Sequence, residues 1–275
     1  MGQDNWSSNK YVKHAAFVPR LGSVILDVLD PQPHEHILDF GCGNGILTRE
    51  LAGRCKSVVG IDASKAMIDG APSVKNVEYF VVDGHDADKW FDETGQSPFD
   101  AVFSSATLHW LKRDPVKAIK SIHHTLKPGG RLVAELGGFM NCASMFFFLI
   151  RICLLIHLKG VHTALIAALN VRGIDGAAYS PWFFPSPEYY SQLLTDNGFK
   201  VLNAELIPRP TELETDVAGW IETFGFNFLN ALDSDSERKK MVAEIQEYLR
   251  PAHQREDGKW FLLYTRLRVV AVKQV

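Results

Sequence analysis

A glycine-rich turn that begins with an acidic residue is the feature of the sequence best suited to hold a ligand. It reads Asp39-Phe-Gly41-Cys-Gly43-Asn-Gly45 and lies between a predicted strand and a helix that we expect to begin near Ile46. Glycines let the chain turn tightly and let a ligand approach without meeting a Cβ atom. The start of the helix points unpaired N–H groups toward the same place. The turn therefore predicts a ligand site at the end of the first strand.

The spacing of the glycines distinguishes between the classes of ligand that such a turn can bind. A dinucleotide-binding turn reads Gly-x-Gly-x-x-Gly, and a phosphate-binding P-loop ends in Gly-Lys-Ser or Gly-Lys-Thr. Neither pattern is present, because Gly45 is followed by Ile46. An acid two residues before the first glycine suits a ligand that carries an amino acid group, since Asp39 can face its ammonium directly or through water.

Two further acids follow the next two predicted strands. Asp62 ends the second strand, where a carboxylate can accept hydrogen bonds from both hydroxyls of a ribose. Asp83, followed by Gly84, ends the third strand and can accept from an adenine amino group, and Met67 can pack on the base. Any one acid could merely cap a helix. Three acids at successive strand ends favour a site for an adenosine-type ligand.

His109, beside Trp110 after the predicted fourth strand, is the candidate catalytic residue. An unperturbed imidazole has a pKa near 6.5, so it could accept a proton at cellular pH. The alternative is a hydrogen-bonded side chain in the wall of the site. The His123-His124 pair has no Cys or carboxylate at ligand spacing, so we expect no metal site.

These residues must be positioned by alternating strands and helices. Runs of apolar and β-branched residues predict strands at 37–40, 56–64, 77–86, 99–110, 129–138, 200–209 and 261–273. Helical patterns lie between the first five, and a longer helical stretch covers 217–249. This alternation predicts a parallel sheet covered on both faces, in a doubly wound, Rossmann-like α/β fold.

Composition excludes several classes of protein. The 275 residues are 46% hydrophobic and 22% charged, as in a soluble globular chain with a substantial core. A net charge of -3 without a basic stripe argues against a nucleic-acid partner. The four cysteines are too few for a disulfide scaffold, and the first residues lack an apolar signal core. We therefore expect a reducing, cytoplasmic setting.

The sequence resembles the class I S-adenosylmethionine-dependent methyltransferases. The motifs ILDFGCGNG, GID, VVDGHD, FDAVFSSATLHW and LKPGGRLVAEL carry this resemblance over about residues 35–140. Later motifs are similar to the trans-aconitate-methyltransferase-like branch, including its fungal members. They are PWFFPSPEYYSQLLTDNGF, PRPTEL with VAGWIETF, and YTRLRVVAVK.

The resemblance implies a seven-stranded, mostly parallel sheet with an antiparallel last strand and helical lid elements. It also implies that S-adenosyl-L-methionine is the cofactor. An N-terminal arm is expected to fold over this cofactor. The candidate cofactor-binding residues are Tyr11, Asp39, Gly41, Gly43, Gly45, Asp62, Ala63, Met67, Asp83, Gly84, Ser104 and Ser105.

On the acceptor side, aromatic residues between prolines are expected to wall the pocket; these are Trp182, Phe183 and Phe184. An anionic acceptor could be held by a bidentate arginine contact. The candidates are Arg20, Arg172 and Arg209, with ordinary surface arginines as the alternative.

A single methyltransferase domain is expected over residues 1–275. It comprises an N-terminal helical arm (1–34), a cofactor-binding core (35–140) and substrate-side or lid segments (141–190 and 211–255). Within the lid, residues 145–160 form an anomalous insert that is apolar on all sides and shorter than the roughly 20 residues of a membrane span. Three interpretations stay open: a buried helix, a membrane-surface element, and a retained intron.

The sequence therefore predicts methyl transfer from S-adenosylmethionine to a small-molecule acceptor, with O-methylation of a carboxylic acid or specialised metabolite favoured. The alternatives are a cofactor-assisted cyclase or a binding module with the same fold, and a protein acceptor. A nicotinamide oxidoreductase is disfavoured, because Ile46 replaces the last glycine of its turn and no Tyr-xxx-Lys pattern is present. We expect no nucleic-acid partner and no stable membrane span.

Overall fold

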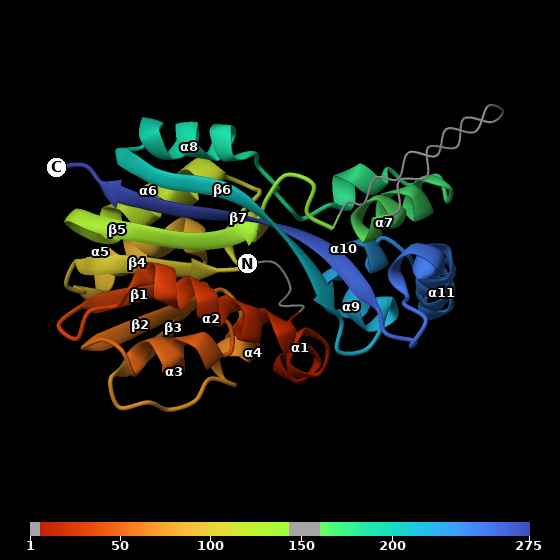
Figure 1. Ribbon diagram of the computed structural model, residues 1–275, viewed down its shortest axis with the longest axis horizontal. Coiled ribbons are helices and arrows are strands. Elements are labelled where there is room, and N and C mark those ends of the chain that lie inside the picture. The colour runs from red at the N-terminus through yellow and green to blue at the C-terminus, as the bar shows by residue number, and fades with distance from the viewer. Residues whose placement is uncertain (1–5, 143–159) are drawn as a thin grey trace.

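Seven strands form one sheet, in the order β3-β2-β1-β4-β5-β7-β6 (Figure 1). The computed structural model describes residues 6–142 and 160–275, apart from the side chains of 8–10 and 19–21. Strands β1 to β5 pair in parallel, and β7 is antiparallel to both β5 and β6. The strands are β1 (His36–Phe40), β2 (Ser57–Asp62), β3 (Val77–Val81), β4 (Phe99–Ser105), β5 (Leu126–Gly137), β6 (Phe199–Glu212) and β7 (Phe261–Lys273). This confirms the predicted doubly wound fold.

The strand order reverses between β1 and β4. From β1 the chain proceeds outward to β2 and β3, and from β4 it proceeds the other way to β5. Neighbouring connections therefore leave on opposite sides of this point, where open α/β sheets bind their ligands. The predicted glycine turn follows β1 directly, so it lies at this switch point.

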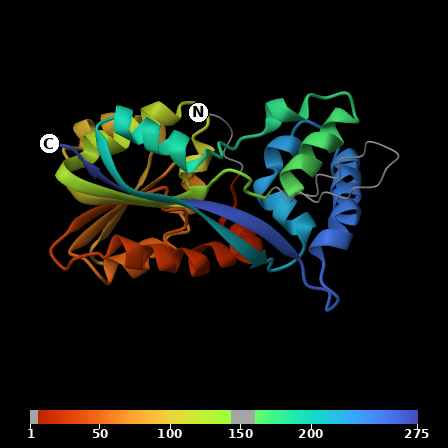
Figure 2. The same cartoon turned by 45° about the horizontal axis from the view of Figure 1, so that its top comes forward.

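Helices cover both faces of the sheet, as Figure 2 shows. One face carries α2 and α3, whose apolar side chains pack with those of β1, β2, β4 and β5. The other carries α5, α6 and α8, which pack on a larger apolar cluster. Their bounds, with the short helices α1, α4, η1 and η2, are α1 (Ser8–Ala15), α2 (Phe17–Leu29), α3 (Ile46–Ala52), α4 (Lys65–Ile68), η1 (Gly84–Asp86), α5 (Ala87–Thr94), η2 (Leu108–Trp110), α6 (Pro115–Thr125) and α8 (Pro187–Asp196).

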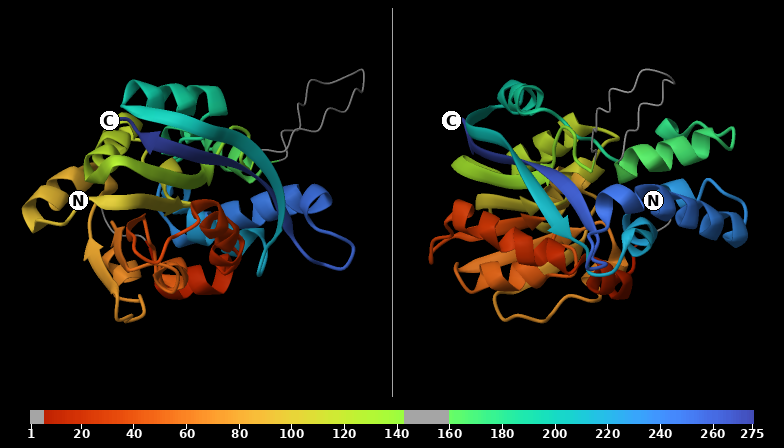
Figure 3. Two further views of the ribbon diagram at one scale, coloured as in Figure 1. Left: turned by 60° about the vertical axis from the view of Figure 1, so that its left-hand side comes forward. Right: turned by 45° about the vertical axis from the view of Figure 1, so that its right-hand side comes forward.

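A separate group of helices lies beyond one end of the sheet (Figures 1 and 3). The long strands β6 and β7 extend out of the sheet toward this group, which has its own apolar cluster. We call these helices the lid. They are α7 (Val161–Asn170), η3 (Gly176–Tyr179), α9 (Val217–Phe224), α10 (Phe226–Leu229) and α11 (Asp235–His253).

Helix starts follow the local sequence. A side-chain oxygen one residue before the helix accepts a backbone N–H that has no partner inside the helix, which stabilises the first turn. The capping residues of α6, α8, α9 and α11 are Asp114, Ser186, Asp216 and Ser234.

The strand expected over 77–86 ends at Val81, and Gly84–Asp86 form η1 instead. Two further predicted elements also have different boundaries. The strand expected over 99–110 ends at Ser105, because Ala106 adopts a left-handed backbone conformation with φ of 58°. The helical stretch expected over 217–249 is interrupted by Gly225, which separates α9 from α10, and again before α11. Both differences arise from backbone breaks that apolar periodicity does not report.

A buried ion cluster fastens β6 and β7 to β5. The carboxylate of Glu135, only 4% exposed, accepts hydrogen bonds from both Nη atoms of Arg209 at 2.8 and 2.9 Å and from Arg268 Nη2 at 2.9 Å. Burial raises the pKa of the Glu135 carboxyl, but the hydrogen bonds and charges of the arginines, chiefly Arg209, lower it by more. Two cations thus share one anion.

We predict that Glu135→Gln lowers the free energy of unfolding by about 3 kcal/mol at pH 7, because it leaves two largely buried guanidinium groups without a counter-charge. Chemical denaturation measures this. Glu247→Gln, which removes an exposed partner of Arg250, is the matched control and should leave the midpoint unchanged.

The difference in unfolding free energy between wild type and Glu135→Gln should also depend on pH, and the direction of the pKa shift gives the sign. Because folding depresses the pKa of Glu135, its stabilisation is present above the ordinary carboxyl value and is lost as pH falls. The difference between wild type and Glu135→Gln should shrink between pH 7 and pH 3. A difference that stays constant over this range would contradict the assignment.

Candidate active site

Three adjoining cavities lie around the glycine turn, and Tyr11 of α1 lines all three. We name each after one charged residue in its wall. The Asp62 cavity has about 690 Å³ of empty space, the Asp39 cavity about 380 Å³, and the Arg266 cavity about 490 Å³. The Asp62 cavity is the largest of the three.

The glycine turn is tied to β2 by backbone hydrogen bonds. The N–H groups of Gly41 and Cys42 both donate to the carbonyl of Ile61, at 2.8 and 2.9 Å. Gly41 has φ of +81°, and a Cβ atom there would lie 2.1 Å from Thr107. Glycine is therefore required at position 41 by both backbone conformation and space.

Asp62 connects the turn to the Asp62 cavity. Its Oδ2 accepts the N–H of Gly43 and its Oδ1 accepts that of Ser64, each at 2.9 Å. A carboxylate offers about four acceptor positions, so it can also receive ribose hydroxyls. Phe40, Met67 and other apolar side chains form the remaining walls. Apolar walls with one carboxylate and bare glycine backbone fit an adenosine group.

Asp39 is the buried acid of the Asp39 cavity. Its Oδ2 accepts a hydrogen bond from Thr48 Oγ1 at 2.7 Å, and the residue is 2% exposed. Burial raises the pKa of this carboxyl to about 7; the Thr48 hydrogen bond lowers it and the charge of Asp62 raises it. An ammonium group beside Asp39 would favour its charged form. The cavity therefore fits the amino acid end of the predicted cofactor.

Most other predicted cofactor residues lie in the same two cavities. Ala63, Met67 and Gly84 line the Asp62 cavity, and Ser105 lines the Asp39 cavity. The structure thus brings together nine of the twelve candidates: Tyr11, Asp39, Gly41, Gly43, Asp62, Ala63, Met67, Gly84 and Ser105.

Gly45, Asp83 and Ser104 line none of the three cavities. Ser104 Oγ donates to the Phe40 carbonyl at 2.8 Å. Asp83 accepts hydrogen bonds from the backbone and ring of His85, and from an arginine side chain. Gly45, with φ of +72°, precedes α3. Each helps to hold the turn or a strand end, and its contact with a cofactor stays a prediction.

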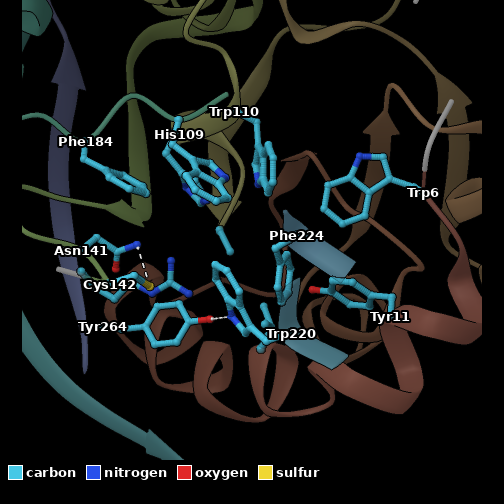
Figure 4. Close-up of a pocket in the computed structure, with 14 residues that line it drawn as sticks. Trp6, Tyr11, His109, Trp110, Asn141, Cys142, Phe184, Trp220, Phe224 and Tyr264 are labelled. Atoms are coloured by element: carbon cyan, nitrogen blue, oxygen red, sulfur yellow. Dashed lines mark hydrogen bonds between the residues drawn. The ribbon is translucent and has the colours of Figure 1, made fainter. Parts of the chain in front are cut away.

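The Arg266 cavity lies between the fourth-strand end and the lid, and Figure 4 shows the aromatic side chains that surround it. Arg266 of β7 is 6% exposed, and its guanidinium carbon lies 4.7 Å from the centre of the Tyr264 ring. Its buried Nε has no hydrogen-bond partner. None of the described residues forms a hydrogen bond or an ion pair with this guanidinium, although its charge helps to lower the pKa of the Glu135 carboxyl.

His109 lines the Arg266 cavity, and its ring is already used as an acceptor. Its Nδ1 accepts the backbone N–H of Gly137 at 3.2 Å. Burial, assisted by the positive charge of Arg266, holds the pKa of His109 well below 6.5. A neutral imidazole with its lone pair on Nδ1 carries its proton on Nε2. The ring therefore offers a donor through Nε2.

The arginines that the sequence suggested for an anionic acceptor are placed elsewhere. Arg209 is bound to Glu135, and Arg172 is bound to Glu244; neither lines the Arg266 cavity. The side chain of Arg20 lies outside the described part of the chain. Sequence reasoning missed Arg266. The available signal was a pair of arginines, Arg266 and Arg268, inside the largely apolar strand FLLYTRLRVVAVK.

Two of the three aromatic residues that the sequence suggested for an acceptor pocket line one of these cavities. Trp182 and Phe184 line the Arg266 cavity. Phe183 instead packs on the apolar cluster beneath the sheet, next to Tyr190. Its neighbours therefore face the cavity while it supports the loop from behind.

Comparison with known proteins identifies the family. A model of a methyltransferase domain matches residues 38–134. An uncharacterised methyltransferase of Schizosaccharomyces pombe is 37% identical over 281 aligned residues, which cover 100% of both chains. The chain belongs to the S-adenosylmethionine-dependent methyltransferases. The trans-aconitate 2-methyltransferase of Pseudomonas aeruginosa is 26% identical over 97% of this methyltransferase and 93% of that protein.

A solved structure of the same fold carries the product form of the cofactor. It is a phosphoethanolamine N-methyltransferase 2 of Haemonchus contortus in complex with phosphomonomethylethanolamine and S-adenosylhomocysteine. The TM-score is 0.53 at 19% identity, over 93% of this methyltransferase and 53% of that chain. The solved structure shows the shared fold. Membership of the family confirms the predicted family and cofactor: this methyltransferase uses S-adenosyl-L-methionine.

Other predictions concern features away from these cavities. Among the described helices, none combines the length and the apolar character needed to cross a bilayer. The described residues also contain no cluster of three or more His, Cys, Asp or Glu that could hold a metal ion. Of the anomalous insert 145–160, residues 145–159 lie outside the described part of the chain.

We predict that Gly41→Ala weakens binding of S-adenosylhomocysteine at least tenfold, because the new Cβ must displace Thr107 and the turn with it. Gly129→Ala is the matched control. Gly129 has a similar φ of +76° but no atom within 4 Å of its Cβ position, so it isolates the cost of the left-handed conformation. Calorimetric titration and thermal unfolding separate binding from stability. Equal losses of binding in both variants would contradict the prediction.

A second prediction concerns pH. Because the pKa of Asp39 lies at about 7 without a ligand, it must lose a proton to pair with the ammonium of S-adenosylhomocysteine. Affinity should therefore rise between pH 5.5 and pH 7.5. 5′-Methylthioadenosine, which lacks the amino acid group, should show no such rise.

Asp39→Asn tests the assignment of this pH dependence. The variant should bind S-adenosylhomocysteine more weakly and with little change in affinity over the same pH range. A rise in affinity that persists in Asp39→Asn would assign the titration to another group.

Proposed function

We propose that this methyltransferase transfers the methyl group to a carboxylate oxygen of a small molecule bound in the Arg266 cavity. One observation carries the proposal: the described residues that line this cavity supply a positive charge and N–H donors, and none of them is suited to remove a proton. Amines, phenols and alcohols need a proton removed before or during attack, whereas a carboxylate is already ionised.

The titratable groups that line the cavity are unsuited to act as bases. Burial raises the pKa of the Tyr11 phenol well above its ordinary value, so this hydroxyl stays protonated. His109 uses the lone pair of Nδ1 on Gly137 and presents Nε2–H. Burial raises the pKa of the Cys142 thiol to about 12, so it is neutral. Burial also raises the pKa of Tyr264 well above its ordinary value, and its hydroxyl accepts from Trp220 Nε1 at 2.5 Å. Among the described lining residues, these properties favour an acceptor that needs no base.

The junction of the cavities supports transfer at this position. Trp6, Tyr11, Ala106 and Trp110 line both the Asp62 and the Arg266 cavity. Ala106 has a left-handed conformation, and its N–H donates to the Glu135 carbonyl at 2.7 Å. A strained residue held between two ligand cavities is consistent with a functional position.

The cofactor supplies a methyl group bound to a positively charged sulfur. An oxygen of the acceptor carboxylate forms the new bond to the methyl carbon as the carbon–sulfur bond breaks, and the bonding pair stays on sulfur. The products are a neutral methyl ester and a neutral thioether, so no proton is released. Walls that align the two groups and exclude water favour such a step.

The relatives, the cavities and the composition also support the carboxylic acid acceptor, the single-domain organisation and the cytoplasmic setting. The Pseudomonas aeruginosa relative is named for methylation of trans-aconitate, a carboxylic acid. The Asp62 and Arg266 cavities meet at Trp110. This arrangement is consistent with a single methyltransferase domain in which the lid covers the acceptor side. A cytoplasmic setting is favoured by the low cysteine content.

The test is transfer of labelled methyl to small carboxylic acids. We expect a product whose label is released as methanol by mild base, since methyl esters hydrolyse and methyl ethers and amines do not. Label retained after base treatment would contradict carboxylate methylation. Binding of S-adenosylhomocysteine without any methylated product would favour a cyclase or a binding module.

His109→Gln refines this test. The glutamine amide can donate a hydrogen bond in place of Nε2–H but cannot act as a base. We expect ester formation to stay within about tenfold of wild type, while His109→Leu loses more. If both variants lose at least a hundredfold, His109 acts as a base and the acceptor is not a carboxylate.

A further inference from the structure

We infer that the Arg266 cavity selects an acid with one carboxylate and an otherwise apolar body, and that Arg266 is the residue that sets this preference. The inference rests on the proposed function and narrows it from carboxylic acids in general to one class. Aryl, alkenyl and fatty monocarboxylic acids belong to this class, and polycarboxylic acids do not.

The charge of the cavity wall matches a single carboxylate. Arg266 is the one residue with a formal charge among the described residues that line the cavity, and no Asp or Glu lies among them. Each further carboxylate would lose its hydration against aromatic rings with no cation to compensate it. Such a transfer costs several kcal/mol for each ion. A dianion or trianion is therefore disfavoured.

The environment of Arg266 leaves its charge available for a ligand. In the strand register, it lies opposite Gly137 of β5 and Ile207 of β6, which carry no charge. The nearest acid along β5, Glu135, makes its hydrogen bonds with Arg209 and Arg268, and the Arg266 charge lowers its pKa only through space. An unpaired guanidinium that is 6% exposed is unfavourable by itself. An external anion is the partner that this site lacks.

The walls of the cavity define the rest of the ligand. Trp182 stacks on Phe184 with ring centres 5.9 Å apart, and Trp110 meets Trp182 edge-on at 5.7 Å. On the lid side, Trp220 and Phe224 lie 5.2 Å apart, and Figure 4 shows both facing the cavity. Trp182 also lies 6.0 Å from Trp220, ring centre to ring centre, so these side chains form a continuous aromatic wall. Such a wall favours a flat or extended apolar body that packs against the ring faces.

The ion pair with Arg266 should act on binding more than on rate. It is strongest with the charged acid and weakens as the carboxylate loses its charge to the methyl group. An interaction that is stronger in the ground state than in the transition state lowers KM without raising kcat. Arg266 is accordingly a specificity-determining residue, and its loss should appear in KM.

The experiment measures initial rates of ester formation with trans-cinnamate, decanoate and trans-aconitate. We expect wild-type kcat/KM to be at least tenfold higher for one of the two monocarboxylates than for trans-aconitate. Arg266→Gln should raise KM for that monocarboxylate about 10- to 100-fold, the range for losing a charged hydrogen-bonded contact. Its kcat should stay within about threefold of wild type. Arg172→Gln removes an arginine that pairs with Glu244 outside the cavity and should leave both constants unchanged.

Two further measurements keep the test decisive if Arg266→Gln does not fold. Arg266→Lys retains the charge and should give a KM between those of wild type and the glutamine variant. With wild-type protein saturated by S-adenosylhomocysteine, calorimetry should find cinnamate bound at least tenfold more tightly than cinnamamide or cinnamyl alcohol. Equal affinities for the charged and neutral compounds would overturn the inference.

The outcomes separate this inference from the proposed function. Preferred methylation of trans-aconitate to a base-labile ester would overturn the inference and leave the proposed function standing. Absence of ester from any acid, with S-adenosylhomocysteine still bound, would overturn the proposed function and this inference with it. A fall in kcat with KM unchanged in Arg266→Gln would also contradict the assigned role.

Discussion

The attachment of the glycine turn to β2 is the constraint on which the geometry of the site depends. Three backbone N–H groups, those of Gly41, Cys42 and Gly43, are satisfied by the Ile61 carbonyl and the Asp62 carboxylate. One residue, Asp62, therefore shapes the turn and lines the largest cavity at the same time. Because the turn follows β1 directly, it also fixes Asp39 at the neighbouring cavity. The cofactor half of the site is thus built from local hydrogen bonds between adjacent strands.

The proposed acceptor half is built differently, from charges distributed along the antiparallel strands. Arg209, Arg266 and Arg268 approach the same region, but Glu135 pairs with the first and the last. That pairing fastens β6 and β7 to β5 and leaves Arg266 as the charge at the cavity. Strand β7 therefore contributes both Arg268 to the Glu135 ion cluster and Arg266 to the cavity. The cluster secures the strand from which Arg266 faces the cavity.

The sequence predicted the cofactor side of the fold well because its signals are local. A strand, a glycine turn and a helix follow one another within about a dozen residues, and Asp62 lies at the next strand end. The acceptor side depends on contacts distant in sequence. Nothing near Arg209 shows that Glu135 is its partner 74 residues away, and nothing near His109 shows that Gly137 donates to it. These pairings require the folded sheet.

The contrast between the two halves bears on how such a site can release its product. A carboxylate held by Arg266 in an apolar cavity is bound through its charge, and methylation removes that charge. The ester keeps its apolar contacts with the aromatic walls but loses the ion pair, so its binding must be weaker than that of the acid. Arg266 is then without a counter-charge again, and a new carboxylate restores the ion pair. A single cation in an apolar pocket therefore favours the exchange of product for substrate, whereas several cations would hold a partly methylated polyacid in place.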